Sequence, residues 1–369
     1  MIADSPIPIA PQIRAAQIVL PCTDLAAELK FFTGQLGFKV NLIMPADSPS
    51  LAVISGHGVT LRLEQRKLPG NQTPLQLRLL CDLAALPADT ADELIAPGGT
   101  RIQLVDVQVP LVIPEGQQEF VLSRGGQNSW GVGRAGMQYR DLIPSRLGGR
   151  FVASHIRIPN GGPVPDYVHF HKIRFQMIFC KTGWAKLVYE DQGEPFLLEA
   201  GDCVLQPPEI RHRVLEASNG LEVIEIGCPA IHETFADHNM ELPTGRFIPG
   251  RYYGDQRFVR HIAAKAAWEP WRLAGFEARD IGIGAATDGL AGVRVVRPLQ
   301  GTTADAPPHG GEFLFFFVLQ GSLDLAGQSI GQHKLGAGDS VVLPADAAYS
   351  VGAANGTEFL EVILPDFAH

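Results

Sequence analysis

Short apolar runs recur along the chain, with polar residues at alternate positions. A period of two is typical of β-strands that bury one face. Forty glycines and 28 prolines divide the runs into short segments, which favours a β-rich fold over a helical bundle. Residues 313–319 are apolar throughout and predict a strand buried on both faces. We expect a helix at residues 256–267, within a linking segment at 229–271.

The first third of the chain shows a different pattern. Residues 18–21 predict a strand, and residues 24–33 predict a helix that Asp24 caps and that carries Leu25, Leu29 and Phe32 on one face. The chain then passes through Gly37 into a strand, and two further strands are expected at 50–54 and 60–64. Four later segments predict a degenerate second module of the same kind: residues 75–81, 90–95, 101–107 and 119–122.

The rest of the chain contains an internal repeat. The segment from Tyr139 recurs from Ala278, the segment from His171 recurs from His309, and the segment from Gly201 recurs from Gly338. The three offsets are 139, 138 and 137 residues, so one unit of about this length occurs twice. Two similar β-rich domains in tandem are therefore expected.

Composition and charge restrict the class of protein. A chain of 369 residues with 46% hydrophobic content is long enough for two or three domains. The net charge of −9, without a basic stripe, argues against a nucleic-acid partner. No apolar stretch has transmembrane length, and residues 1–6 lack the features of a secretion signal, so no membrane association is expected. The five scattered cysteines indicate reduced, buried thiols and a cytoplasmic location.

Three histidines carry the strongest chemical signal. His169 and His171 are one residue apart, so on a strand both side chains project from the same face. If a neighbouring strand brings His212 to that face, three imidazoles converge. Three neutral imidazoles with an open position can hold Fe, Mn, Zn, Cu or Ni. A buried histidine is more often a satisfied core residue, but three at this spacing favour a site for a divalent transition metal.

The spacing resembles that of the cupin family. In the first cupin motif a glycine, two histidines, a glutamate and a second glycine follow one another; here Gly162, His169, His171, Gln176 and Gly183 take these places. Gly201, Pro207 and His212 match the second motif. The resemblance implies two tandem jelly-roll barrels, with His169, His171 and His212 as metal ligands and Gln176 in the place of a fourth.

This sequence departs from the cupin pattern at several positions. Six residues instead of five separate Gly162 from His169, and the glutamate position holds Gln176. Glu209 and Glu216 replace a glycine and an asparagine of the second motif. An amide cannot neutralise a metal as a carboxylate does, so Gln176 leaves three possibilities open: amide ligation, a hydrogen bond to bound water, or an empty site.

The second repeat has lost the metal pattern. Pro307, Leu314 and Tyr349 stand at the positions of His169, Gln176 and His212, while His309 matches His171 and Glu312 lies nearby. This favours a structural barrel that packs against its partner over a small apolar ligand pocket. A pair formed by His309 and Glu312 stays open as an alternative.

The expected order of strand, helix and three strands in the first third, with the residues around Gly37, resembles the vicinal oxygen chelate (glyoxalase/dioxygenase) superfamily. The resemblance places Gln17 and Glu64 at metal-ligand positions of that superfamily, but these two residues alone do not make a convincing site. We expect a non-catalytic domain that serves packing, dimerisation or ligand sensing, and a homodimer is possible.

The predicted fold is therefore mostly β: two tandem jelly-roll cupin barrels after an N-terminal α+β domain of βαβββ type. The expected domains are residues 1–130, a metal-binding barrel at 131–240, and a linker with a degenerate barrel at 241–369.

By analogy with ring-cleaving bicupins, the first hypothesis is a dioxygenase with Fe, or with Mn, Ni, Zn or Cu, that acts on a small anionic aromatic or enolic acid. Arg174 and Arg211 are candidates to orient a carboxylate, and Tyr167 is a candidate to gate the site, although a solvated loop or surface ion pair is the more common role of such an arginine. The alternatives are a metal-dependent isomerase and a non-enzymatic small-molecule-binding or regulatory bicupin.

Overall fold

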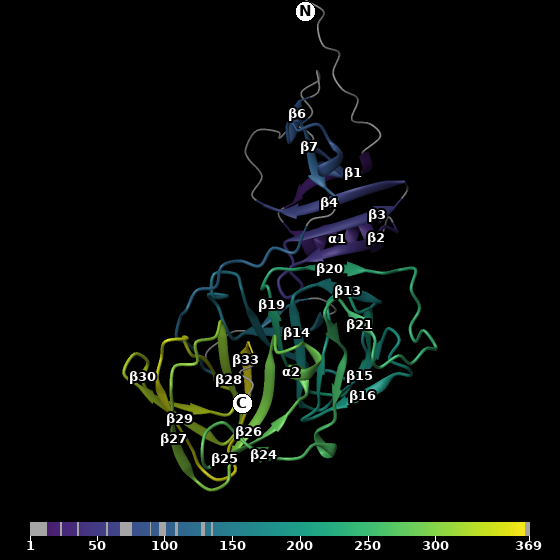
Figure 1. The fold of residues 1–369 in the computed structure, drawn as a ribbon. Helices are drawn as coiled ribbons and strands as arrows, with labels where there is room; N and C mark the ends of the chain where they lie inside the picture. Colours follow the sequence, from purple (N-terminus) through teal and green to yellow (C-terminus); the bar gives the residue numbers. More distant parts are fainter. Residues whose placement is uncertain are drawn as a thin grey trace, which may run out of the picture. The chain divides into compact units, whose positions relative to one another are not determined.

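The computed structural model (Figure 1) describes residues 13–365 except 23, 35–36, 57, 67–75, 89, 96–100, 108–109, 127–129 and 134–135. Contacts divide the chain into two compact units. Unit 1 comprises Met1–Leu111 and Glu233–Ala236, and unit 2 comprises Val112–His232 and Asp237–His369. Among the described residues, none of the helices has the length and apolar character needed to cross a bilayer. Residues 1–6, the two residues of the resemblance around Gly37 that precede it (Gln35 and Leu36), and Leu75 of the expected strand at 75–81 lie outside the described residues.

Unit 1 is built on one mixed sheet. Helix α1 (Leu25–Gly34) begins after Asp24, whose Oδ1 accepts a hydrogen bond from the Ala27 N–H at 2.9 Å. Its buried Leu25 packs with the apolar face of the sheet. Strand β1 (Ile13–Cys22) runs parallel to β4 (Val59–Gln65), and β5 (Gln76–Cys81) runs parallel to β7 (Arg101–Asp106). The strands, in spatial order, are β20 (Glu233–Ala236), β2 (Lys39–Met44), β3 (Leu51–Gly56), β4 (Val59–Gln65), β1 (Ile13–Cys22), β5 (Gln76–Cys81), β7 (Arg101–Asp106) and β6 (Glu93–Ile95).

The first barrel of unit 2 consists of two facing sets of strands. One set holds β23 (Val259–His261), β17 (Cys203–Leu205), β14 (Phe175–Thr182), β19 (Leu221–Cys228), β11 (Val152–Ile158), β10 (Gln138–Asp141) and β9 (Gly131–Val132). The other holds β16 (Phe196–Glu199), β15 (Trp184–Tyr189), β18 (His212–Ala217) and β13 (His169–Lys172), with β12 (Gly162–Pro163) also paired to β18.

The second barrel repeats this plan. One sheet holds β24 (Glu269–Pro270), β25 (Phe276–Asp280), β26 (Gly292–Pro298), β33 (Glu358–Leu364), β28 (Phe313–Gln320), β31 (Ser340–Val342) and β8 (Val121–Ser123). The other holds β27 (Thr302–Ala306), β32 (Tyr349–Ala353), β29 (Ser322–Gly327) and β30 (Gly331–Gly336). The short helix α2 (Ile283–Ala286) and the hairpin of β21 (Tyr252–Tyr253) and β22 (Gln256–Arg257) complete unit 2.

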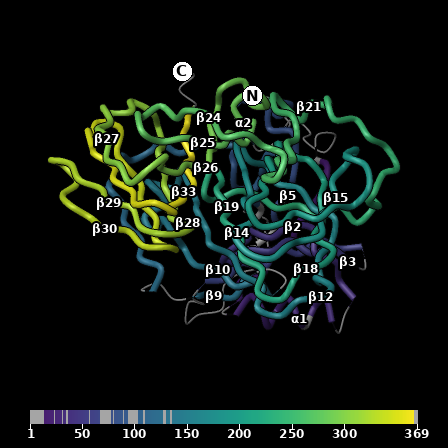
Figure 2. Tube along the Cα trace, turned by 90° about the horizontal axis from the view of Figure 1, so that it is seen from below, coloured from purple at the N-terminus to yellow at the C-terminus, as the bar shows by residue number. Residues whose placement is uncertain are grey.

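The two barrels share one apolar core. Figures 1 and 2 show β28 and β33 (yellow) alongside β14 and β19 (teal to green). One side of each of these strands contributes to a common cluster, in which the rings of Phe151 and Phe313 stack with centroids 4.2 Å apart. The other sides fill two separate barrel interiors. The expectation that residues 313–319 form a strand buried on both faces agrees with this arrangement.

The turn glycines of the two repeats show the same constraint. Gly183, between β14 and β15, and Gly321, between β28 and β29, have φ values of 77° and 75°. A Cβ atom at Gly183 would lie 2.3 Å from Ser218 Oγ, and one at Gly321 would lie 2.6 Å from Thr357 Oγ1. Both positions therefore require glycine for conformation and for space.

Two expectations from the sequence are wrong. Residues 256–267 do not form a helix, because Val259–His261 pairs with β17 and only Ala263–Lys265 forms a 3-10 turn. Residues near 119–122 do not continue the N-terminal module, because Val121–Ser123 pairs with β31 of the second barrel. Sheet pairing overrides helix propensity in the first case and local pattern in the second.

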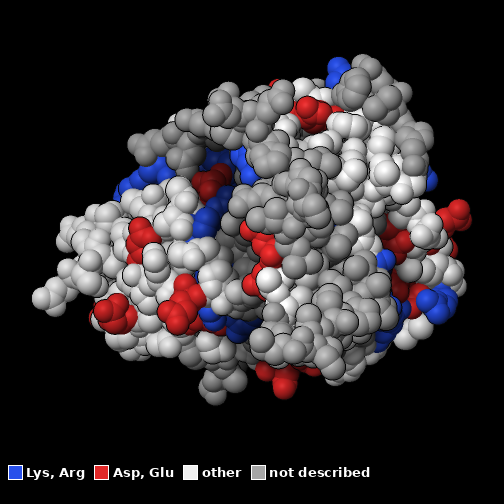
Figure 3. Space-filling view, turned by 90° about the horizontal axis from the view of Figure 1, so that it is seen from above, with Lys and Arg blue, Asp and Glu red and all other residues white. Residues whose placement is uncertain are grey.

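Charged side chains are mixed on the face shown in Figure 3. The described Lys and Arg residues lie among Asp and Glu residues in small groups on that face, without a continuous basic stripe among them.

Candidate metal site

The three sequence-predicted histidines converge inside the first barrel. His169 and His171 lie on β13, and the Cα of His169 is paired with that of His212 on β18. One nitrogen from each ring lies within 4.8 Å of the other two, and all three side chains are buried. Among the described residues, this is the one group of three or more His, Cys, Asp or Glu residues with such geometry.

Backbone carbonyls fix the orientation of two of these rings. His169 Nδ1 lies 2.8 Å from the Tyr167 carbonyl oxygen, and His212 Nδ1 lies 2.9 Å from that of Ile210. Because a carbonyl oxygen only accepts, each Nδ1 carries the proton and Nε2 keeps its lone pair. This tautomer presents Nε2 as a donor to a metal.

Asp166 supports the same histidine from the adjoining loop. Its carboxylate is buried, with Oδ1 3.6 Å from His169 Nδ1 and Oδ2 accepting a hydrogen bond from the Val214 N–H at 2.9 Å. The second contact anchors the loop that precedes β13 to β18. Asp166 therefore holds the two histidine-bearing strands in register.

Gln176 lies on β14 and is 2% exposed. Its Nε2 donates to Glu225 Oε1 at 2.5 Å, whereas its own Oε1 is buried and has no hydrogen-bond partner among the described residues. Glu225 on β19 is a residue that the motif comparison missed, because the motif ends before this strand. An available signal was the repeat itself, which places Glu361 at the corresponding position of the second barrel.

Two further side chains adjoin the imidazoles. The Tyr189 ring stacks on His212 with centroids 5.4 Å apart, and its hydroxyl accepts a hydrogen bond from Gln206 Nε2 at 2.9 Å. Burial raises the pKa of Tyr189, so this phenol stays protonated. His232, which sequence reasoning missed, lies with its ring centroid 5.3 Å from that of His171, and its Nδ1 is 3.0 Å from the Pro229 carbonyl oxygen.

The departure from the cupin motif at Glu209 has a conformational consequence. Glu209 adopts a φ of 61°, in the left-handed region that a glycine enters without strain. Its N–H donates to the His171 carbonyl oxygen at 3.0 Å. The chain therefore keeps the glycine-like turn that delivers His212 to the site, although the residue is a glutamate.

The candidate anchoring residues have well-defined contacts. Arg174 binds Glu312 of the second barrel, with its Nη2 2.8 Å from Oε1. The Arg211 guanidinium stacks over Phe170 at 3.9 Å and pairs with Asp237 at 3.3 Å. Because Phe170 alternates with the histidines along β13, Arg211 lies on the side opposite to the imidazoles. The Tyr167 ring lies 6.1 Å from that of His169, and its gating role stays a prediction.

The donor set fits a divalent transition metal. Three imidazoles converge, two of them with Nε2 left as the donor, and the buried amide oxygen of Gln176 adds an unpartnered acceptor on the wall of the same barrel. Nitrogen ligands of this kind suit Fe, Mn, Ni, Zn and Cu.

Comparisons with known proteins define the fold. No family model and no curated protein matches the chain. Salicylate 1,2-dioxygenase from Pseudoaminobacter salicylatoxidans, solved with gentisate, is 16% identical, with 68% of this chain and 82% of that chain covered and a TM-score of 0.50. Oxalate decarboxylase from Lactobacillus farciminis, in a formate complex, is 13% identical, with 71% and 90% covered and a TM-score of 0.50.

A third structure, the protein YlbA from E. coli, is 13% identical, with 69% of this chain and 93% of that chain covered and a TM-score of 0.50. Unit 2 has the cupin fold. At these identities the likeness concerns the fold alone. Combined with the buried three-histidine cluster, it confirms the coarse prediction of a cupin-type protein with a candidate metal site.

The second cupin barrel places different side chains at the corresponding positions. His309 uses both ring nitrogens, since Nε2 lies 3.0 Å from the Leu343 carbonyl oxygen and Nδ1 accepts from the Gly311 N–H at 3.1 Å. Glu312 is held by Arg174 and Arg150 of the first barrel. The pair of His309 and Glu312 that the sequence left open is therefore engaged in other contacts.

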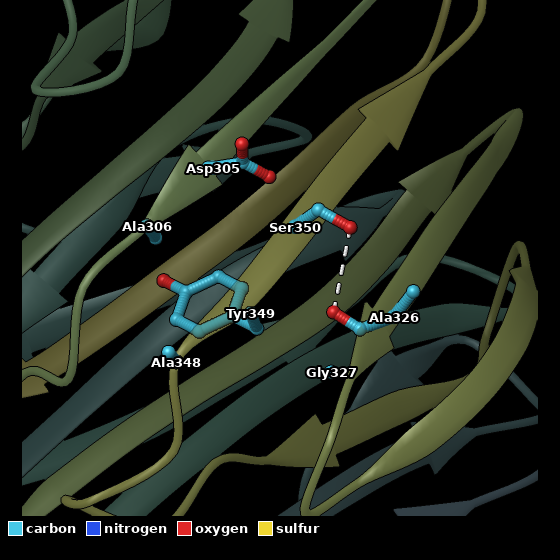
Figure 4. A pocket seen from close by; sticks show the side chains of 7 residues that line it. All are labelled: Asp305, Ala306, Ala326, Gly327, Ala348, Tyr349 and Ser350. Carbon is cyan, nitrogen blue, oxygen red and sulfur yellow. Dashed lines mark hydrogen bonds between the residues drawn. The ribbon is translucent and has the colours of Figure 1, made fainter.

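A hollow of about 350 Å³ opens between strands of this second barrel (Figure 4). Its lining comes from β27, β29 and β32 and includes one carboxylate, that of Asp305. Tyr349 and the hydrogen bond from Ser350 Oγ to the Ala326 carbonyl oxygen at 3.4 Å border it. The hollow contains none of the candidate metal ligands.

The two ligand positions suggested for unit 1 are engaged separately. Gln17 Oε1 lies 3.5 Å from Arg78 Nη1, and Glu64 pairs with Arg62. The register of β1 and β4 sets Glu64 opposite Pro21, several residues from Gln17.

Proposed function

We propose that this chain is a metal-dependent oxidoreductase, a dioxygenase that acts on a small chelating aromatic or enolic acid in the first cupin barrel. Fe is the expected metal, with Mn, Ni, Zn or Cu as alternatives to be tested. His169, His171 and His212 would hold the ion, and Gln176 would complete the set. The observation that carries the proposal is the buried convergence of three imidazole donors within 4.8 Å.

The charge of the donor set supports an anionic substrate. Three imidazoles and an amide are neutral, so a divalent ion among them keeps most of its positive charge. A dianionic chelate such as a deprotonated catechol would compensate that charge. Two fold neighbours are solved with gentisate and with formate, both anions, which is in keeping with this substrate class.

The ion when bound would supply Lewis acidity and, as iron, redox chemistry. The protein's own residues contribute binding geometry. The Tyr167 and Ile210 carbonyls fix two imidazoles, and the buried ring of Tyr189 stacks on His212. Arg174 and Arg211 stay proposed carboxylate anchors. Each guanidinium would first have to exchange its ion-pair partner, and Arg211 would also have to leave Phe170 on the side opposite to the imidazoles.

The test is oxygen consumption by the Fe(II)-loaded protein with a panel of catecholic, hydroxybenzoic and enolic acids. We expect uptake with at least one acid, loss of uptake with a chelator, and loss in His212→Ala. His309→Ala is the matched control, because it removes a repeat-related histidine outside the site, and it should retain uptake.

Other outcomes would select other functions. Metal binding without oxygen uptake, but with isomerised product, would support the isomerase alternative. Ligand binding without turnover across Fe, Mn, Ni, Cu and Zn would support a regulatory or binding bicupin. Absence of bound metal in the wild-type protein would overturn the proposal itself.

For unit 1 we propose a vicinal oxygen chelate-like domain that serves packing, dimerisation or ligand sensing. Contiguous strands β2, β3, β4 and β1 with α1 support this interpretation. Light scattering of the full chain would test the homodimer. A cytoplasmic location likewise stays a proposal, which the five free, buried cysteines favour.

A further inference from the structure

The interior of the first barrel holds a carboxylate that the cupin motif does not include. Gln176 and Ile178 share one face of β14, and Val223 and Glu225 share one face of β19. Ile178 and Val223 pack in the apolar cluster of the first barrel interior, which also contains Tyr189. Glu225 and Gln176 therefore face the interior in which Tyr189 stacks on His212.

The contact between Glu225 and Gln176 fixes the amide. An ionised carboxylate only accepts hydrogen bonds, so the nitrogen of Gln176 must face Glu225. The Gln176 Nε2 to Glu225 Oε1 distance is 2.5 Å. The amide oxygen is thereby turned to the other side, where it is buried without a hydrogen-bond partner among the described residues. A buried unpaired acceptor is costly, which indicates a ligand at that point.

The second barrel, which lacks the metal pattern, shows what lies beside the counterpart of Glu225. Cα pairing sets Ile178 opposite Glu225 and, in the repeat, Phe316 opposite Glu361. Glu361 is fully buried and accepts from Arg272 Nη2 at 2.7 Å, while the same Nη2 donates to the Tyr349 hydroxyl at 2.9 Å. Tyr349 is the repeat counterpart of His212. In the second barrel a protein cation thus lies between the counterparts of His212 and Glu225.

We propose that Glu225 supplies the negative charge of the three-histidine centre through Gln176, whose amide it orients and polarises so that Oε1 becomes the fourth donor to the metal. Donation of the amide N–H to a carboxylate shifts electron density onto the amide oxygen. The negative charge that a glutamate at position 176 would carry thus lies on Glu225, which is hydrogen-bonded to the Gln176 side chain. Glu225 is a positioning residue, and this role rests on the metal binding of the proposed function.

Mn²⁺ titration followed by EPR measures this role without any substrate. Wild-type protein should bind one Mn²⁺ per chain. Glu225→Gln should bind it about 10–100-fold more weakly, because replacing a residue that hydrogen-bonds a metal ligand generally lowers metal affinity by this factor. The exchange variant Gln176→Glu with Glu225→Gln keeps one carboxylate and one amide in contact. It should recover most of the lost affinity, because its carboxylate stands at the metal.

Glu222→Gln is the matched control. It removes a carboxylate from the same strand but from the opposite face, where Glu222 contacts Lys181 and His155, and its Mn²⁺ affinity should equal that of the wild type. If Glu225→Gln does not fold by circular dichroism, the exchange variant decides: an affinity within tenfold of wild type, or a tighter one, supports the proposal, and binding that is weaker by tenfold or more (~1.4 kcal/mol) overturns it.

Three results would contradict the proposal. One is an unchanged Mn²⁺ affinity in Glu225→Gln, even if its thermal stability falls, since that would mean a structural role alone. Another is a loss of affinity that the exchange variant does not restore. The third is an equal loss in Glu222→Gln. A wild-type protein that binds no Mn²⁺, Fe²⁺ or Zn²⁺ would instead refute the metal-dependent function on which the inference rests.

Discussion

The buried carboxylate of the second barrel permits a quantitative prediction. Glu361 is completely buried and accepts hydrogen bonds from Trp271 Nε1 at 3.1 Å and from Arg272 Nη2 at 2.7 Å. Burial lowers the pKa of Arg272, but Glu361 and Tyr349 outweigh this effect and raise the pKa above its ordinary value. The guanidinium therefore stays charged, and its counter-charge is Glu361.

Glu361→Gln should remove that counter-charge and leave Arg272 uncompensated. Breaking a buried ion pair from one side costs about 3–5 kcal/mol. The Arg272 side chain is 26% exposed, so solvent will screen part of this cost. We expect a loss of about 3 kcal/mol, the lower end of that range.

Urea denaturation monitored by circular dichroism and tryptophan fluorescence measures this loss. Glu358→Gln on the same strand is the control, since this carboxylate is only half-buried, and it should change stability by less than about 0.5 kcal/mol. Joint replacement of Glu361 and Arg272 by leucine should be much less harmful than the single change, because it removes Arg272 together with its counter-charge, while Arg294 keeps its ion pair with Asp280. A loss below about 1 kcal/mol in Glu361→Gln, or a double variant less stable than the single one, would refute the reasoning.

Further predictions concern the shared core, the thiols and one surface-facing carboxylate. Phe313→Ala removes a buried ring stacked on Phe151 and should cost about 3–5 kcal/mol, with both barrels unfolding in a single urea transition; separate transitions would contradict a common core. Burial raises the pKa of Cys180 to about 12 and also raises that of Cys203, so at pH 8 these thiols should react with a disulfide reagent only after unfolding; rapid native labelling would disprove this. Hydrogen bonds from His155 and Lys181 lower the pKa of Glu222 to about 2. The ionised Glu222 therefore contributes its full stabilisation of the fold above the ordinary pKa of 4.5, and this stabilisation is lost as pH falls toward 2. Glu222→Gln should therefore cost about 1 kcal/mol at pH 7 after discounting for partial exposure, and the difference from wild type should narrow below pH 4.5; a difference that is constant with pH would contradict the ion pair.

The sequence was sufficient to predict that His169, His171 and His212 converge, because their convergence depends on local rules. His169 and His171 share a face by strand alternation, and Pro207 with the turn at Glu209 sets the start of β18. The repeat offsets likewise predicted two similar barrels. Each of these inferences used spacing within one or two neighbouring strands.

The contacts of Arg174 and Glu225 could not be predicted in the same way. Arg174 is adjacent to the motif, yet its partner Glu312 lies on the other barrel. Glu225 reaches Gln176 only because β19 pairs with β14 at a particular register. The failed helix at 256–267 has the same origin, since its residues follow the sheet edge at β17 instead of their own propensity. Contacts between residues distant in sequence determine the position of Arg174, the position of Glu225 and the strand at Val259–His261.

The two faces of strand β28 pack in two different apolar cores. Phe313, Phe315 and Phe317 pack in the core common to both barrels, whereas Leu314, Phe316 and Val318 fill the interior of their own barrel. After a duplication, mutations at the second set could erase a ligand site while the first set preserved the partnership between the halves. The interior of the second barrel can therefore change its side chains without disturbing the core that it shares with the first barrel.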